Sequence, residues 1–199
     1  MSEAPGKPTI LAAPEPASGF RHWMARNAWR LLLLFAGVLL PLAGFVALAD
    51  EVHEFESFHF DAPLLWQMHG LHSPWLDRIF VLLSKLGYEW FLIPADVLIV
   101  GALAWHRRWR EATFVAVSFV GSALLNMGSK HFFQRDRPSL WESIAPESTF
   151  SFPSGHAMGS MTLAVTLVLL AWNTRWRWPV LLLAPSFSLL VSVSRVYLG

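Results

Sequence analysis

The chain has 199 residues, of which 54% are hydrophobic, 14% aromatic and only 15% charged, and its mean hydropathy is +0.43. An ordinary soluble domain carries about a quarter charged residues, so this composition excludes such a domain and indicates a small helical membrane protein. Because cysteine is absent, a disulfide framework, a thiolate metal site and a cysteine nucleophile are also excluded.

The first thirty residues differ in composition from the rest. Residues 1–20 are rich in Pro, Ala, Gly and Ser and poor in aromatic residues, which is typical of disorder. A cleavable signal peptide is not predicted, because the first apolar run begins only at Leu31 and no cleavage site precedes a soluble domain. We therefore expect residues 1–30 to form a disordered cytoplasmic tail and residues 31–199 a membrane domain.

Five apolar runs follow, each close to the roughly 20 residues that cross a bilayer core. They are Leu31–Ala49, Tyr88–Trp105, Ala112–Met127, His156–Trp172 and Trp178–Val193. Backbone in lipid must satisfy its own hydrogen bonds, so these runs predict helices. In the connector after the first run, Trp75–Leu86 has apolar residues at helical spacing and predicts an interfacial helix. The expected fold is an all-α integral membrane bundle with five transmembrane helices in this chain.

The lysines and arginines predict the orientation of this bundle. The short loops 106–111 and 173–177 are almost purely basic, and the N-terminal segment adds further cations. Cytoplasmic loops carry such an excess, so we expect the N-terminus and these loops to be cytoplasmic. Because the loops are short and tied to span ends, we interpret them as orientation determinants and expect no nucleic-acid partner.

The loop between the third and fourth runs then faces outward, and it holds the most informative residues. Lys130 and Arg137 stand at its start, the motif Pro153-Ser154-Gly155-His156 at its end, and Arg195 near the outer end of the last run. An isolated cation at a span end usually reaches toward lipid headgroups. Several on one membrane face, beside a helix start, predict an anion site instead, because Arg binds phosphoryl oxygens bidentately and helix N-terminal amides favour anions.

Individual residues of this loop suit phosphate chemistry. His156 has an ordinary pKa of about 6.5 and can donate a proton to a departing oxygen. Gly155 allows the backbone to approach phosphoryl oxygens closely. Pro138 is expected to fix the direction in which Arg137 leaves the chain.

Lys130 followed after six residues by Arg137-Pro138, then Pro153-Ser154-Gly155-His156, then Ser194-Arg195 resembles the signature of the type 2 phosphatidic acid phosphatase superfamily. The resemblance implies hydrolysis of a lipid phosphate or pyrophosphate of the phosphatidic acid, phosphatidylglycerophosphate or undecaprenyl pyrophosphate class. It implies a bacterial inner-membrane location, an outward-facing site, a phosphohistidine intermediate and no cofactor or metal. The roles it implies are His156 as general acid and a phosphate-binding set of Lys130, Arg137, Ser154, Gly155 and Arg195.

The third motif departs from the family pattern. In the family the nucleophilic histidine follows Ser-Arg after five residues, whereas only four residues follow Arg195 here. We expect this chain to be part of a longer protein, with the nucleophile two positions after Gly199 and a sixth span. The alternatives are an inactive protein that binds phosphate or lipid headgroups, or a small lipid transporter. A vanadium haloperoxidase shares the motifs, but those enzymes are soluble. The sequence predicts no particular oligomeric state.

Two features lie outside these motifs. His53, His59, His69 and His72 favour a solvated loop over a metal site, because only the last pair approaches a helical ligand spacing. Asp96 lies inside the second run, after Pro94, where an ionisable residue is a candidate functional residue. An Asp hydrogen-bonded beside a helix kink and an Asp with a role in substrate entry both fit this pattern.

Overall fold

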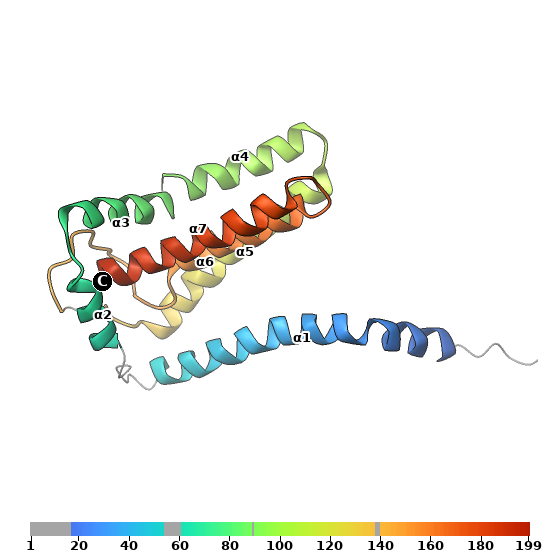
Figure 1. Cartoon of the computed structure of the whole chain (residues 1–199), viewed down its shortest axis with the longest axis horizontal. Helices are drawn as coiled ribbons and strands as arrows, with labels where there is room; N and C mark the ends of the chain where they lie inside the picture. Colours follow the sequence, from blue (N-terminus) through green and yellow to red (C-terminus); the bar gives the residue numbers. More distant parts are fainter. Residues whose placement is uncertain (1–16, 54–60, 89, 138–139) are drawn as a thin grey trace, which may run out of the picture. The chain divides into compact units, whose positions relative to one another are not determined.

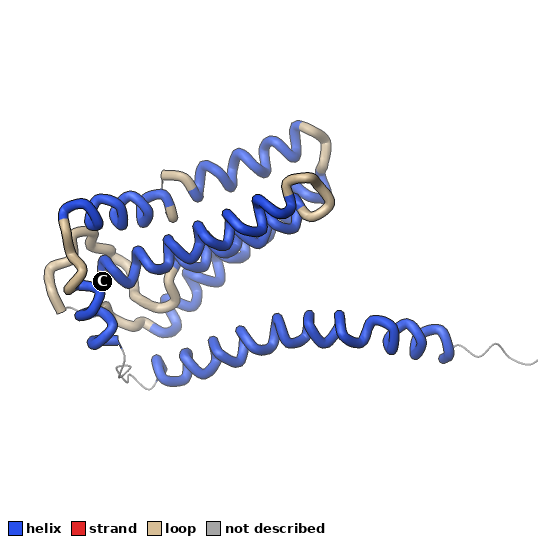
Figure 2. Tube along the Cα trace, viewed as in Figure 1, coloured by secondary structure: helices blue, strands red, loops and turns tan. Residues whose placement is uncertain are grey.

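The computed structural model describes residues 17–53, 61–88, 90–137 and 140–199. All regular structure in these ranges is helical, and none of them contains a strand (Figure 2). The predicted all-α class is therefore confirmed. The chain divides into two compact units, Met1–Leu48 and Ala49–Gly199.

Helix α1 spans Ala17–His53 and provides the regular structure of the first unit. It begins earlier than the Leu31 that the apolar run predicts, so residues 17–30 of the expected tail are helical. The helix extends because the segment from Arg21 to Arg30 contains good helix formers and neither glycine nor proline. By length and composition α1 can cross a membrane.

The second unit contains six helices, labelled in Figure 1. They are α2 (Asp61–His69), α3 (Pro74–Leu86), α4 (Leu92–Trp105), α5 (Trp109–Phe133), α6 (Gly155–Ala171) and α7 (Arg177–Leu198). Of these, α5 and α7 are long and apolar enough to cross a membrane, whereas α4 and α6 are shorter apolar helices. The count of five spans therefore stays a prediction. The helix expected at Trp75–Leu86 is present as α3, and α2 was not predicted.

Helix α3 lies close to the end of α7. Its start is fixed by Ser73, whose Oγ accepts a hydrogen bond from the Leu76 amide at 3.4 Å, followed by Pro74 in the first turn. Just after its end, a Cβ on Gly87 would collide with the side chain of Val191 in α7. The connector therefore presses onto the helix that carries Arg195.

Small polar residues allow α6 and α7 to pack closely. Ser160 and Ser188 are fully buried between them, and their hydroxyls form a hydrogen bond of 3.0 Å. Small residues are typical of such contacts in membranes because they let helix backbones approach. In contrast, Leu98 and Leu182 are 71% and 70% exposed. Serines inside and leucines outside are the reverse of the pattern in a soluble protein, and this pattern suits helices surrounded by lipid. The chain is a membrane protein.

The two ends of this unit differ in chemistry. The α4–α5 and α6–α7 turns lie together at one end (Figure 1) and carry five arginines, Arg107, Arg108, Arg110, Arg175 and Arg177. We call this the basic end. The end of α5, the start of α6 and the end of α7 meet at the opposite end, which we call the site end.

Candidate active site

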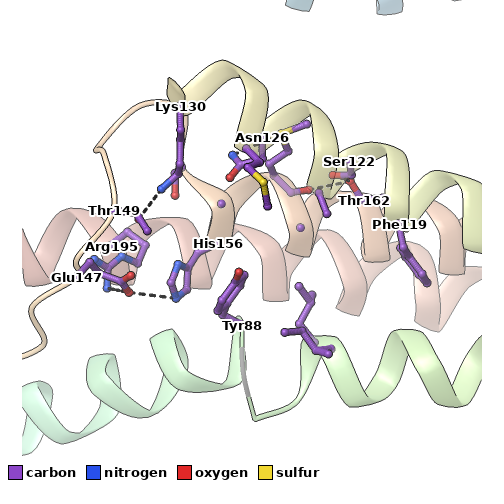
Figure 3. Close-up of a pocket in the computed structure, with 18 of the residues that line it drawn as sticks. Tyr88, Phe119, Ser122, Asn126, Lys130, Glu147, Thr149, His156, Thr162 and Arg195 are labelled. Carbon is purple, nitrogen blue, oxygen red and sulfur yellow. Dashed lines mark hydrogen bonds and ion pairs between the residues drawn. The ribbon is translucent and has the colours of Figure 1, made fainter. Parts of the chain in front are cut away.

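One cavity of about 310 Å³ opens at the site end and is lined by α4, α5, α6, α7 and the loop between α5 and α6 (Figure 3). All six residues predicted to act on phosphate line it: Lys130, Arg137, Ser154, Gly155, His156 and Arg195. The structure therefore brings the three sequence motifs together, and the roles of the residues stay predictions. Pro138 lies outside the described residues.

The loop after α5 turns back over the end of the bundle. Helix α5 ends at Phe133, and the next residue, Gln134, adopts the left-handed conformation with φ of 46°. The Ser151 amide and hydroxyl then donate to the Arg135 carbonyl, each at 2.9 Å. Arg135 also pairs with Asp61 of α2, and the Ser143 hydroxyl donates to the Leu198 carbonyl at 2.9 Å. These contacts anchor the loop to both α2 and α7.

Two of the cations are held by the returning part of this loop. Lys130 Nζ donates to Thr149 Oγ1 at 2.7 Å and to the Phe150 carbonyl at 2.8 Å. Arg137 Nε donates to the Thr149 carbonyl at 2.9 Å. Both side chains therefore start from defined positions beside the cavity, and Lys130 also lies in the last turn of α5, where the helix dipole favours a cation.

The Pro-Ser-Gly-His turn is fixed by a residue that no motif identified. Asn126 Nδ2 donates to the Pro153 carbonyl at 3.2 Å, and Asn126 Oδ1 lies 3.1 Å from where a Cβ on Gly155 would stand. A Cβ at this position would press against the Asn126 side chain, so the close contact favours glycine here. Ser154 caps α6, since its Oγ accepts from the Ala157 amide at 3.4 Å. Helical geometry leaves the first amides of α6 without intrahelical partners.

His156 and Arg195 meet around a buried serine and a carboxylate. Arg195 Nη1 donates to Ser84 Oγ at 2.9 Å, and that oxygen lies 3.5 Å from His156 Nε2. Glu147 Oε1 lies 3.6 Å from Arg195 Nη1 and 3.7 Å from His156 Nε2. Arg195 Nη2 is buried and has no hydrogen-bond partner among the described residues. An unsatisfied buried donor is costly, so this geometry calls for a further acceptor.

Sequence reasoning missed four residues around His156: Ser84, Tyr88, Asn126 and Glu147. The Tyr88 ring lies 5.1 Å from the His156 ring, and all but Ser84 line the cavity. A signal for Ser84 was available, because it follows Phe80 by one helical turn and so interrupts the apolar face of α3. Glu147 gave no signal, since its position depends on how the loop folds.

Ser84→Ala tests whether this serine positions Arg195. The variant removes an acceptor from a buried guanidinium, so we expect lipid phosphatase activity to fall about tenfold or more. We also expect a changed pH–rate profile, because His156 loses the same neighbour. Ser186→Ala, which removes an exposed serine from α7, is the matched control. Activity and pH profile equal to those of the control would exclude a positioning role for Ser84.

The other histidines belong to different surroundings. His69 stacks on Trp141 with ring centroids 4.3 Å apart, and His72 stacks on Tyr197 at 4.6 Å and pairs with Asp77 at 2.9 Å. Both are half-buried, so the expected solvated loop is wrong for these two because aromatic side chains cover them. His59 and the side chain of His53 lie outside the described residues. Within the described ranges, no group of three or more His, Asp or Glu residues is placed to hold a metal ion.

Comparisons with known proteins agree with these motifs. The family model of the PAP2 superfamily, the type 2 phosphatidic acid phosphatases, matches residues 111–199. Phosphatidylglycerophosphatase B of Bacillus subtilis (strain 168) is 32% identical over 134 residues, covering 65% of this chain and 66% of that protein, just under two thirds of its length. Undecaprenyl-diphosphatase of Sulfolobus acidocaldarius is 32% identical over 176 residues, covering 86% of this chain and 78% of that protein.

A solved structure gives the same result. The crystal structure of a transmembrane PAP2 type phosphatidylglycerolphosphate phosphatase from Bacillus subtilis superposes with a TM-score of 0.69 and 28% sequence identity. The superposition covers 79% of this chain and 81% of that one. The resemblance inferred from the motifs is confirmed, and this chain belongs to the PAP2 superfamily.

Proposed function

We propose that this protein is a lipid phosphatase that hydrolyses the phosphate monoester or pyrophosphate of a membrane lipid. The observation that carries the proposal is the convergence of Lys130, Arg137 and Arg195 around His156, with a buried guanidinium N–H that lacks an acceptor. A phosphoryl oxygen supplies that acceptor. The names of the relatives, phosphatidylglycerophosphatase and undecaprenyl-diphosphatase, support the same class of substrate.

In the proposed reaction, phosphate enters where Glu147 now contacts Arg195 and His156, and it displaces this carboxylate. The three cations and the first amides of α6 bind its oxygens and stabilise the charge that develops in the transition state. His156 donates a proton to the leaving oxygen as the P–O bond breaks. A histidine nucleophile, which the family resemblance implies, forms an N–P bond, and water then cleaves this phosphohistidine to release inorganic phosphate.

The orientation is also part of the proposal. The arginine-rich turns lie at the basic end and the cavity at the site end. If the basic end is cytoplasmic, as the charge rule predicts, the active site faces the outer side of a bacterial inner membrane. A lipid diffusing in that leaflet reaches the cavity laterally.

Phosphate release by the full-length protein tests the proposal. The protein in detergent is incubated with phosphatidic acid, phosphatidylglycerophosphate or undecaprenyl pyrophosphate, with and without EDTA. We expect release of inorganic phosphate that EDTA does not change, together with an acid-labile phosphoprotein after rapid quenching. Binding of these lipids without phosphate release would instead support the inactive binding protein. Inhibition by EDTA would contradict catalysis without a metal.

A further inference from the structure

Helix α3 packs along the part of α7 that carries Arg195 (Figure 1). Three contacts join α3 and the residue after it to α7, and they are Gly87 against Val191, Ser84 with Arg195, and Asp77 with Tyr197. The residue numbers rise along α3 as they fall along α7, so the two helices run antiparallel. A slide or rotation of α7 would disturb all three contacts together, and they therefore fix its position against α3.

The contact between Tyr197 and Asp77 is the polar anchor at the end of this row. Tyr197 Oη donates to Asp77 Oδ1 at 2.6 Å, and the tyrosine is only 1% exposed. His72 Nδ1 lies 2.9 Å from the same carboxylate oxygen. A buried tyrosine hydroxyl needs a hydrogen-bond partner, and Asp77 supplies it.

Packing alone does not explain this pair. The Tyr197 ring lies against the rings of His72 and Phe80, with centroids 4.6 Å and 4.2 Å away. Phenylalanine would make the same ring contacts without a hydroxyl that has to be satisfied. Asp77 stands in the first turn of α3, where the helix dipole favours an acidic residue, but the dipole requires no contact with α7. The hydroxyl and the carboxylate together thus indicate a role in orienting α7.

Arg195 is the site residue on which this orientation acts. It precedes Tyr197 by two positions in the last turn of α7, so a movement of that turn moves both residues. Arg195 Nη1 donates to Ser84, whereas Nη2 is buried and has no hydrogen-bond partner among the described residues. A guanidinium binds phosphoryl oxygens well only when its planar fork points at them. A displacement of about 1 Å is enough to lower a rate strongly.

We propose that Asp77 is a positioning residue for the phosphate site. By accepting the hydrogen bond from Tyr197 it holds the last turn of α7, and in this way it directs the guanidinium of Arg195 toward the phosphate. The inference rests on the proposed function, because it takes Arg195 as a phosphate-binding residue. Asp77 and Tyr197 are not among the residues that line the cavity, so their effect passes through Arg195.

The test measures vanadate affinity and lipid phosphate turnover of the full-length protein in detergent. We expect Tyr197→Phe to weaken vanadate binding and to lower kcat/KM, each by about fivefold to tenfold, the effect of one lost hydrogen bond. Asp77→Leu should lose at least as much, whereas Asp77→Asn keeps an acceptor oxygen and should stay within twofold of the wild type. Ser188→Ala removes a buried hydrogen bond between α6 and α7. It is the matched control and should bind vanadate as the wild type does.

The same substitution in an Arg195→Ala background separates positioning from general stabilisation. Without the guanidinium, Tyr197→Phe should weaken vanadate binding by less than a further twofold, because two changes that act through one group are not additive. A full further loss in that background would show that the contact only stabilises the helix, and the positioning role would be wrong. If the wild type releases phosphate and Tyr197→Phe equals it, the positioning role is also wrong and the proposed function stands. If the wild type binds vanadate but releases no phosphate from any lipid, the proposed function fails, and the vanadate comparison still decides the role of Asp77.

Discussion

His156→Ala is expected to reduce the turnover of a lipid phosphate by about 10²- to 10⁴-fold, the range typical of losing a positioned general acid. The side chain is largely buried between Ser84, Tyr88 and Glu147, which hold its ring in the wall of the cavity. Binding of vanadate should remain within a few-fold of the wild type, because the three cations are untouched. Phosphate release and vanadate titration measure the two effects separately.

The controls for this prediction follow from the structure. His156→Gln keeps most of the side-chain volume but cannot transfer a proton, so it should lose as much turnover as the alanine variant. His106→Ala removes a histidine at the basic end, after α4, and should leave activity unchanged. Wild-type turnover in both His156 variants would show that His156 is not the general acid. Loss of vanadate binding in both would show that it holds the phosphate site together instead.

Arg195→Lys is expected to lower kcat/KM by about 100-fold and to weaken vanadate binding at least tenfold. The guanidinium uses Nη1 for Ser84 while Nη2 is left without a partner in the described residues. One planar group thus contacts the connector and a ligand together, which the ammonium of lysine cannot reproduce. Only 9% of the Arg195 side chain is exposed, and in such a buried setting a lost hydrogen bond is costly.

Arg78→Lys on the exposed side of α3 is the matched control and should behave as the wild type. Arg195→Ala should be at least as damaging as the lysine variant. Equal kcat/KM for Arg195→Lys and wild type would mean that a point charge is sufficient, and the bidentate contact with phosphate would then be wrong.

The sequence predicted the helices and the group of motif residues that line the cavity, because both depend on local spacing. The apolar runs marked α4 to α7 to within a few residues, and the motif residues lie at the ends of helices, which membrane geometry brings to one face. Ser84 could not be placed in this way. Its contact with Arg195 joins residues separated by 111 positions and depends on how closely α3 packs on α7 beside Gly87.

Glu147 and Asn126 were missed for related reasons. Glu147 lies in an irregular loop whose course is set by contacts with α2 and α7, so no periodic pattern indicates its direction. Asn126 lies in a largely apolar stretch of α5 and supports the turn through the Pro153 carbonyl. Its position one helical turn before Lys130 was visible in the sequence, but its partner was not.

The carboxylate of Glu147 has a consequence for selection among lipids. Ordinary phospholipids are abundant in the bilayer and carry a phosphodiester. Its single negative charge equals that of a carboxylate. A phosphate monoester carries a charge of about −1.5 to −2 at neutral pH. To reach Arg195 and His156, an incoming group has to compete with an anion that is already tethered beside them. Bulk lipids then gain little by the exchange, whereas a terminal phosphate gains about half to one unit of charge. The protein's own side chain would in this way protect the proposed catalytic residues from the surrounding membrane.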